Sequence, residues 1–479
     1  MQFPDRHDGR GTASFGERPV GSRVGNVHRY TEADDKTARA LAEFCIQRLA
    51  MQAPLDNPLR LEDLEALAGS TVTPAGIGAD ESLRLWQDVL GPACLSVDHP
   101  RYLSFIPSAP TKAAASFDML VGASSVYGGS WLEGSGAVYV ENQALRWIAD
   151  LAGLPPEAGG VFVQGGTIGN LSALVAAREH ALLQRAGKRP DRWAVCVTGE
   201  THSSVKHALR VVMDADVVEV PGDERGRMTG PALRATVAAL SPRERDGIFA
   251  VVATGGTTNL GVIDDIDGIA DVADDHEWWL HVDCAYGGAG LAAPSVRHLY
   301  RGVERADSFI VDPHKWFFAP FDSCALIYRD PSQGRAAHTQ HASYLEPVTI
   351  EGEWNPSDFA IQLSRRARGL PFWFSLAVHG TDAYRDAIET TLSGARAGAD
   401  LIRQADHLRM LVEPDLTVLV FERVGWDEAD YDAWSARLLH EQTAFVTPTK
   451  HNDKICTRFA IVNPLTTSHD LALIIESMR

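Results

Sequence analysis

A lysine, Lys315, lies in the segment VDPHKWFFAP, where apolar and aromatic residues flank it. A lysine in such surroundings usually lays its methylene chain along the aromatic rings and keeps its ammonium in water. A desolvated lysine can instead have a lowered pKa and act as an amine nucleophile. The residue alone does not distinguish the two roles, so the other polar residues of the chain must decide.

A second candidate is Asp283, which ends the apolar run WWLHVD and is followed by CAYGG. An isolated carboxylate in apolar surroundings is costly, so a buried aspartate needs a partner. The small residues that follow leave room for a flat molecule to approach. An aspartate that merely caps a turn has the same pattern, and both interpretations stay open for this residue alone.

The segment FVQGGTIGNLSALVAAR predicts a strand, a glycine-rich turn and a helix. Backbone N–H groups of Gly165, Gly166 and Thr167 would face an anion such as a phosphate at the positive end of that helix. An ordinary capped turn would look the same. Another strand, IFAVVAT, runs into GGTTNLG and supplies hydroxyl groups at Thr257 and Thr258.

These features together are more specific than any one of them. A phosphate cradle, a carboxylate for a ring nitrogen and an amine for an aldehyde are the three requirements of pyridoxal phosphate, and Lys315 would bind its aldehyde. A dinucleotide pattern, G-x-G-x-x-A, also occurs at residues 288–293. Pro294 follows it at once and the expected strand-end acid is missing, which argues against a nicotinamide or flavin site.

The elements that must position these residues change along the chain. Residues 1–95 begin with an arm rich in Gly, Arg and Asp and continue with helical periodicity. In residues 96–370 helices alternate with apolar strands, which is typical of a largely parallel sheet with both faces buried. Residues 371–479 indicate a smaller α/β domain. The predicted strands of the middle region are GGVFVQ, WAVCVTG, DVVEVP, IFAVVAT, WWLHVD, SFIVD and CALIYR.

Two expectations follow from this arrangement. A cofactor site should lie at the carboxyl ends of the strands, as in other open α/β sheets. The stretch from Arg329 to Trp354 is rich in turn residues and predicts a long loop, of the kind that serves as a lid or binding segment.

In its motifs the sequence resembles the group II pyridoxal-phosphate decarboxylases, the family of aromatic amino acid, histidine and glutamate decarboxylases. The resemblance implies fold type I of the pyridoxal-phosphate-dependent transferases: a large, mostly parallel sheet domain, a small C-terminal α/β domain and a helical N-terminal segment. The matching motifs, in the family's order, are HPRYLSFIPSAPT, GGTIGNLSALVAAR, THSSVKHAL, ATGGTTNLGVIDDI, LHVDCAYGG, VDPHKW, SYLEP and RRARGLPFW.

The resemblance also implies roles for individual residues. Lys315 matches the lysine bound to the cofactor, Asp283 the acid paired with its ring nitrogen, and His202 the histidine stacked on its ring. Tyr344 matches a loop tyrosine credited with protonating the α-carbon after carbon dioxide leaves. The other cofactor-binding positions match at Gly166, Thr167, Thr258, Ala285, Asp312 and His314.

One of these positions departs from the pattern. Aromatic amino acid decarboxylases usually carry asparagine where this chain has Asp312. A carboxylate beside a phosphate is unfavourable, so we expect Asp312 to turn to a backbone or lysine partner instead.

Substrate residues are less distinctive. The resemblance places Phe105, Ser108 and Tyr127 in the substrate pocket, with Gly129 where aromatic decarboxylases have a bulky residue. The aromatic residues among them could equally pack in a core or an interface.

The predicted reaction is decarboxylation of an L-amino acid to its amine and carbon dioxide, with aromatic substrates favoured. Alternatives are an aliphatic, acidic or diamino substrate, oxidative deamination to an aldehyde, a phosphate-dependent lyase on the same fold, and a cofactor-binding protein without turnover. Retention of both His202 and Tyr344 favours simple decarboxylation.

Composition limits the classes of partner that the protein can bind and the cellular compartment in which we expect it. The net charge of −19 and the pI near 5.3 argue against nucleic acid and anionic membranes as partners. The six cysteines lack CxxC spacing, which indicates reduced thiols and no zinc site. With no apolar stretch of about 18 residues and no signal-peptide pattern, we expect a cytoplasmic protein. The amphipathic N-terminal helices and the family resemblance predict a homodimer with shared active sites.

Overall fold

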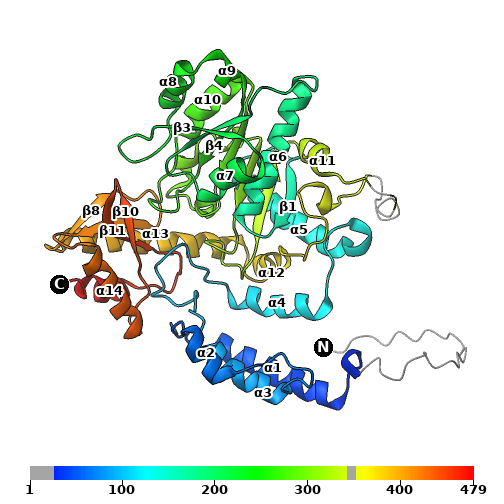
Figure 1. Cartoon of the computed structure of the whole chain (residues 1–479), viewed down its shortest axis with the longest axis vertical. Coiled ribbons are helices and arrows are strands. Elements are labelled where there is room, and N and C mark those ends of the chain that lie inside the picture. The colour runs from blue at the N-terminus through cyan, green and yellow to red at the C-terminus, as the bar shows by residue number, and fades with distance from the viewer. Residues whose placement is uncertain (1–25, 342, 344–351) are drawn as a thin grey trace, which may run out of the picture. The chain divides into compact units, whose positions relative to one another are not determined.

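The computed structural model describes residues 26–341, 343 and 352–479 (Figure 1). These residues divide into two compact units. The first contains the described residues up to Met51 together with residues 61–91, and the second contains residues 52–60 and the described residues from Pro92 onward. Within the described ranges, no helix has both the length and the apolar character needed to cross a membrane.

The first unit is helical, as its periodicity predicts. Its longest helix begins with a capping box, in which the side chains of Thr31 and Asp34 each accept a hydrogen bond from the other residue's backbone amide. This helix has no buried residue, and it leaves Leu41 and Ile46 exposed. The elements of this unit are α1 (Glu32–Ala50), α2 (Leu61–Ala68), α3 (Ala79–Leu85) and a π turn (Trp86–Leu90), after a 3-10 turn at Asn26–His28.

The second unit is built on a seven-stranded sheet in the order β1-β7-β6-β5-β4-β2-β3. All seven predicted strands are present, and β2, β4, β5, β6 and β7 are buried at every residue, as their continuous apolar runs predict. The strands are β1 (Gly159–Val163), β2 (Ala194–Thr198), β3 (Asp216–Val220), β4 (Ile248–Thr254), β5 (Trp279–Asp283), β6 (Ser308–Val311) and β7 (Cys324–Tyr328).

The sheet is parallel from β3 to β6 and antiparallel at its other edge, where β7 pairs with both β6 and β1. Parallel neighbours need a crossover connection, usually a helix. The loop between β6 and β7 carries Lys315 and contains no helix, so β7 returns in the opposite direction.

Helices cover both faces of this sheet (Figure 1). Alternate residues of β4 divide between two apolar clusters: Val251 and Ala253 pack with side chains of α5, α8 and α10, whereas Ala250 and Val252 pack with those of α6 and α7. The helices of this region are α4 (Lys112–Ser124), α5 (Trp131–Leu151), α6 (Gly166–Gln184), α7 (Ser203–His207), α8 (Gly230–Ala239), α9 (Pro242–Asp246), α10 (Ile266–His276), α11 (Pro331–His338) and α12 (Leu370–His379). Shorter turns lie at Ala208–Val212, Gly287–Ala292, Arg297–Tyr300, Val303–Arg305 and Pro356–Asp358.

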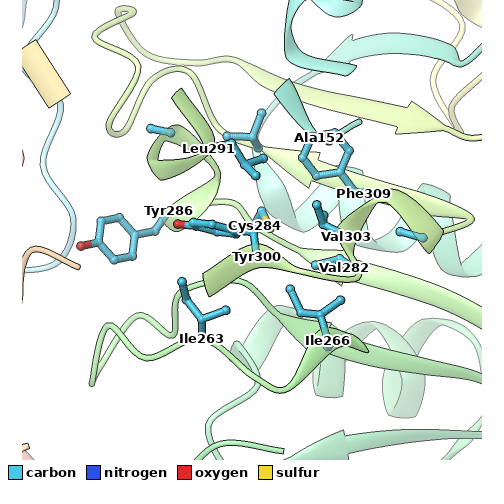
Figure 2. Close-up of a cluster of buried hydrophobic side chains, with 14 of the residues drawn as sticks. Ala152, Ile263, Ile266, Val282, Cys284, Tyr286, Leu291, Tyr300, Val303 and Phe309 are labelled. Carbon is cyan, nitrogen blue, oxygen red and sulfur yellow. The ribbon is translucent and has the colours of Figure 1, made fainter. Parts of the chain in front are cut away.

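Strand β5 shows how the core sets the direction of a functional residue. Figure 2 shows Val282 and Cys284 among apolar side chains that include Tyr286, Tyr300 and other buried residues of the first cluster. Successive side chains of a strand point to opposite faces. Because Val282 and Cys284 are held in this cluster, Asp283 between them points to the other face of the sheet.

The C-terminal part of the chain adds a four-stranded antiparallel sheet in the order β10-β11-β9-β8. Strands β9 and β11 form its centre, and Phe421 and Phe459 pack between this sheet and its helices. The outer strand β10 (PTKH) is polar and starts with proline, so it lacks the apolar run that marks a buried strand. The elements are α13 (Thr381–Gln404), β8 (Leu408–Val412), β9 (Val418–Arg423), α14 (Glu428–His440), β10 (Pro448–His451), β11 (Lys454–Ala460) and α15 (Ser468–Glu476).

The predicted loop from Arg329 to Trp354 is partly wrong, because its first part is helix α11. Asp330 caps this helix by accepting a hydrogen bond from the Ser332 amide, and Pro331 occupies its first turn. His338 at its end is buried, with Nε2 3.0 Å from the carbonyl oxygen of Ser172. The pair Asp330-Pro331 is a signal for the start of a helix. The prediction favoured a loop because the residues after this pair are mostly polar.

Candidate active site

A cavity of about 290 Å³ lies at the carboxyl ends of β4, β5 and β6, where the sequence predicted a site. It brings together residues from segments far apart in the chain. Its lining residues are Gln164, Gly165, Gly166, Thr167, Asn170, His202, Thr254, Gly256, Thr258, Asp283, Ala285, Tyr286, Asp312, His314, Lys315, Phe321 and Asp322. Every cofactor-binding position predicted above is among them.

The glycine-rich turn after β1 forms one wall of the cavity. Gly165 precedes α6 with φ of +96°, a backbone conformation that a residue with a side chain rarely adopts. A Cβ atom on Gly166 would come within 3.1 Å of Asp312 Oδ2 and 3.4 Å of Ala285 Cβ. The turn therefore brings bare backbone and the positive end of a long helix to the cavity, which suits an anion.

Asp283 lines the cavity and is 4% exposed. Its Oδ1 accepts a hydrogen bond from the Ala285 amide at 3.0 Å, and its Oδ2 accepts one from Asn170 Nδ2 at 2.9 Å. Each oxygen of the buried carboxylate thus has a fixed donor, which stabilises its charged form and holds its orientation.

A chain of hydrogen bonds continues behind Asp283. Asn170 donates through its amide nitrogen, so its oxygen faces His281 Nε2 at 2.8 Å and accepts a hydrogen bond from the N–H of that ring nitrogen. His281 Nδ1 then accepts from the hydroxyl of Ser308 at 2.8 Å, and Ser308 accepts from Trp279 Nε1 at 2.8 Å. Burial lowers the pKa of His281 to about 4 despite the opposing effect of Asp283, so the ring is neutral.

Sequence reasoning missed both Asn170 and His281. His281 lies two residues before Asp283 on the same strand, so both side chains are on the same face of the sheet. That spacing was the available signal for His281. Asn170 lies in the first turns of the helix that follows the cradle, inside the motif GGTIGNLSALVAAR, where no role was assigned to it.

Lys315 and Asp312 form an ion pair inside the cavity wall. Lys315 Nζ lies 3.0 Å from Asp312 Oδ2, with side-chain exposures of 18% and 2%. The same oxygen accepts the Gly166 amide hydrogen at 3.3 Å. Asp312 therefore has both of the partners, lysine and backbone, that its sequence position suggested as alternatives.

The pKa values of this pair shift in opposite directions. Burial opposes both charges, but the attraction of Asp312 and Asp283 outweighs it and raises the pKa of Lys315. Burial likewise acts against Asp312, but the positive charge of Lys315, with a smaller effect of His314, holds the pKa of Asp312 below the ordinary value. Both directions favour the charged pair.

Two histidines complete the lining. His202 caps α7 through Nδ1, which accepts the Ser204 amide hydrogen at 3.2 Å. His314 is buried and its Nδ1 lies 2.7 Å from the Ser323 carbonyl oxygen; burial lowers its pKa.

The predicted substrate residues do not line this cavity. Ser108 is buried and donates to the Ala319 carbonyl at 2.9 Å, and Tyr127 donates to the Leu363 carbonyl at 3.3 Å. Phe105 is 59% exposed. Tyr344, the predicted proton donor, lies outside the described residues.

Arg458, which sequence reasoning did not single out, holds the segment that contains Phe105. Arg458 is 8% exposed, and its guanidinium donates to the Phe105 carbonyl at 2.9 Å. Burial lowers the pKa of Arg458 to about 10. The only sequence signal was one charged residue in the apolar strand CTRFAIVN.

The lining fits pyridoxal phosphate. Two buried oxygens on the wall, Thr254 Oγ1 and Asp312 Oδ1, have no hydrogen-bond partner in the described part of the chain, which marks a place for a polar ligand. An anion cradle, a fixed carboxylate and a lysine amine match the phosphate, the ring nitrogen and the aldehyde of that cofactor. Among the described residues, no cluster of His, Cys, Asp and Glu could hold a metal ion.

Comparisons with known proteins agree with this chemistry. A family model described as the pyridoxal-dependent decarboxylase conserved domain matches residues 78–424. An aromatic-L-amino-acid decarboxylase of Bacillus atrophaeus is 28% identical over 394 residues, which cover 80% of this chain and 81% of that protein. An L-2,4-diaminobutyrate decarboxylase of Rhizobium meliloti (strain 1021) is 30% identical over 392 residues, covering 80% of this chain and 78% of that protein. The crystal structure of Oryza sativa TDC with PLP and tryptamine superposes with a TM-score of 0.82 at 24% identity, covering 96% of this chain and 99% of that one.

Proposed function

Because this chain belongs to the pyridoxal-dependent decarboxylases and is a carboxy-lyase that uses pyridoxal phosphate, we propose that it converts an aromatic L-amino acid to its amine and carbon dioxide. The observation that carries the proposal is the meeting of Asp283, Lys315 and the Gly165–Gly166 turn at one cavity. The architecture is fold type I, as the resemblance implied.

Each polar group of the cofactor has a partner in this proposal. Backbone amides at the start of α6 would hold the phosphate, and Lys315 Nζ would bind the aldehyde. Asp283 would pair with the ring nitrogen. The supporting contacts would come from Thr167 and His314 at the phosphate, Thr258 at the ring hydroxyl, and His202 and Ala285 at the ring faces.

When bound, pyridoxal phosphate supplies a ring that takes up the electron pair left on the α-carbon as carbon dioxide departs. Asp283 supports this by holding a proton on the ring nitrogen, since a carboxylate in a site of low dielectric favours the cationic form of its partner. The Asn170 amide and the Ala285 N–H keep both carboxylate oxygens in place. Asp283 therefore acts without having to reorient.

Tyr344 would donate the proton that replaces the carboxylate on the α-carbon, through its Oη atom. This role rests on the motif SYLEP and on the family resemblance that assigns its tyrosine this step. His202, on the cavity wall, is the alternative donor.

The substrate class rests on the relatives. Several are named as aromatic-L-amino-acid decarboxylases, from bacterial and insect sources. The L-2,4-diaminobutyrate decarboxylase at 30% identity makes a diamino acid the second candidate. The two candidates differ in side-chain charge, which an assay can separate.

The test is a panel of amino acids incubated with the purified, cofactor-loaded enzyme, with carbon dioxide and amine measured together. We expect aromatic amino acids to give both products in equal amounts, and Lys315→Ala to give neither. Turnover of 2,4-diaminobutyrate alone would move the proposal to diamino acids. Aldehyde and peroxide in place of amine would indicate oxidative deamination, and no turnover of any amino acid would contradict the proposal.

We also propose that the enzyme works as a cytoplasmic homodimer whose residues 1–95 form the dimerisation segment, with a cofactor domain at 96–370 and a small domain at 371–479. The exposed apolar side chains of α1 support the dimer. Sedimentation should give twice the chain mass, and protein lacking residues 1–95 should be insoluble. A soluble and active monomer after that deletion would contradict this assembly.

A further inference from the structure

The Asp312 carboxylate occupies two groups that the cofactor needs. Its Oδ2 accepts the Gly166 amide hydrogen of the cradle at 3.3 Å and lies 3.0 Å from Lys315 Nζ. We propose, on the basis of the proposed cofactor site, that Asp312 is an internal competitor that sets cofactor affinity: its charge competes with the phosphate for the cradle and with the aldehyde for the lysine.

The competition for the cradle is electrostatic. Asp312 is 2% exposed, so little water screens its charge from an anion at the Gly166 amide. The positive end of α6 has one carboxylate beside it already, and a phosphate placed there would meet a like charge. When a phosphate binds, Asp312 must either release the amide or take up a proton. Otherwise its charge stays beside the phosphate and repels it.

The competition for the lysine concerns its proton. An amine attacks an aldehyde only in its neutral form, so the Lys315 ammonium must first release one proton to solvent. The neutral amine then forms a C=N bond to the aldehyde carbon, and the aldehyde oxygen leaves as water with the two remaining amine hydrogens. The Asp312 carboxylate stabilises the ammonium and so holds back the first of these steps.

Asp322 provides a matched control in the same cavity. It also lines the wall, but its carboxylate pairs with Arg368 Nε at 3.0 Å and is 43% exposed. Asp322→Asn removes the same unit of charge from the same cavity without touching the Gly166 amide or Lys315. A general effect of net charge would appear in both variants, whereas the proposed competition appears only in Asp312→Asn.

The first measurement is the dissociation constant of pyridoxal phosphate by equilibrium dialysis, for the wild type, Asp312→Asn and Asp322→Asn. We expect Asp312→Asn to bind at least about tenfold more tightly than the wild type, the size expected for removing one close like charge. Asp322→Asn should stay within about twofold. Inorganic phosphate should compete more strongly in Asp312→Asn than in the wild type.

The second measurement is the pH dependence of covalent attachment, trapped with borohydride and counted by mass spectrometry. Asp312 favours the ammonium form of Lys315, so its neutralisation should let attachment begin at lower pH, by about one pH unit or more. Asp312→Ser serves as a second neutral variant, with folding checked by thermal unfolding.

Equal or weaker cofactor affinity in both neutral variants would overturn this inference and leave the proposed function standing, because the wild type would still bind the cofactor at Lys315. Equal gains in Asp312→Asn and Asp322→Asn would also overturn it. A wild type that takes up no pyridoxal phosphate would overturn the cofactor site itself, and this inference with it.

Discussion

Asn170 Nδ2 lies 2.9 Å from Asp283 Oδ2 and joins the helix of the phosphate cradle to the strand that carries the carboxylate. The other end of the Asn170 amide faces His281, so the amide cannot rotate without losing both bonds. The orientation of Asp283 thus depends on two residues that lie inside the motifs GGTIGNLSALVAAR and LHVDCAYGG but were assigned no role there.

Asn170→Asp should make the reaction more sensitive to pH. Two carboxylates would then face each other, and repulsion would raise the pKa of one of them. At acidic pH the new residue is protonated and donates to Asp283 as the amide does, so activity should approach that of the wild type. As pH rises the proton is lost and kcat should fall, by about tenfold or more. Parallel pH profiles for variant and wild type would show that Asn170 does not orient Asp283.

His281→Gln should change the acid stability of the fold. The pKa of His281 is lowered by burial from 6.5 to about 4, so the native state resists protonation. Its contribution to the free energy of unfolding is present above pH 6.5 and is lost as pH falls toward 4. The loss should amount to about 2–3 kcal/mol. The free energy of unfolding in urea should depend less steeply on pH in His281→Gln than in the wild type. An unchanged slope would show that groups other than His281 cause the pH dependence.

The buried pair of Glu141 and Arg365 should be essential to stability. Their charged atoms lie 2.8 Å apart at exposures of 2% and 0%, and Glu141 also accepts the Gly369 amide hydrogen at 2.7 Å. Glu141→Ala leaves a buried guanidinium unpaired and should cost about 3–5 kcal/mol of unfolding free energy in urea. Asp118→Ala breaks a more exposed pair with Arg366 and should cost about 1 kcal/mol or less.

Glu141→Leu combined with Arg365→Met tests the reason for that loss. The double variant removes both buried charges, so it should recover most of the stability that Glu141→Ala loses. A double variant as unstable as the single one would mean that packing, rather than an unpaired charge, sets the cost.

Lys315→Arg should separate binding of the cofactor from its covalent attachment. Arginine keeps a positive charge beside Asp312 but has no amine that can join the aldehyde. We expect no covalent adduct after borohydride treatment and no amine production, whereas noncovalent cofactor binding persists in dialysis. Lys206→Arg is the control, because Lys206 pairs with Glu219 away from the cavity. A borohydride-stable adduct in Lys315→Arg would assign attachment to another lysine.

Tyr344→Phe should slow amine production by about a hundredfold or more, the usual effect of removing a general acid. Only a hydroxyl is lost, so cofactor binding should not change. Part of the product should become aldehyde, because a carbanion that waits for its proton can react with oxygen. Wild-type amine production without aldehyde would point to His202 as the proton donor.

The parts of the site that were predictable from sequence lie in short segments directly after apolar strands. Lys315, Asp283 and the Gly165–Gly166 turn all follow such strands, and the carboxyl ends of neighbouring parallel strands lie together. Asn170 was not predictable, because its contact with Asp283 exists only after α6 packs across the sheet. His281 looked like one more residue of a buried strand.

The fold, like the site, was predictable from the sequence in part. Continuous apolar runs indicated the buried strands of the large sheet, whereas β10 has no such run because it forms a polar edge. Helix α11 was read as loop because its residues are mostly polar, and its only buried residues are Gly334 and His338. The antiparallel direction of β7 at the sheet edge was also missed, because an apolar run does not show in which direction a strand runs.

The pairing of β1 with β7 has a consequence for the order in which the protein assembles. Gly159 lies opposite Tyr328, so the strand that leads into the phosphate cradle finds its sheet neighbour only after that later segment has been synthesised. Contacts between residues so distant in the chain form slowly, because a long loop must close first. On the ribosome, β2 to β6 can pair as they emerge, whereas β1 keeps both edges open until β7 arrives. The cradle is therefore among the last parts of the site to be fixed, and a nascent chain arrested before Cys324 cannot hold it.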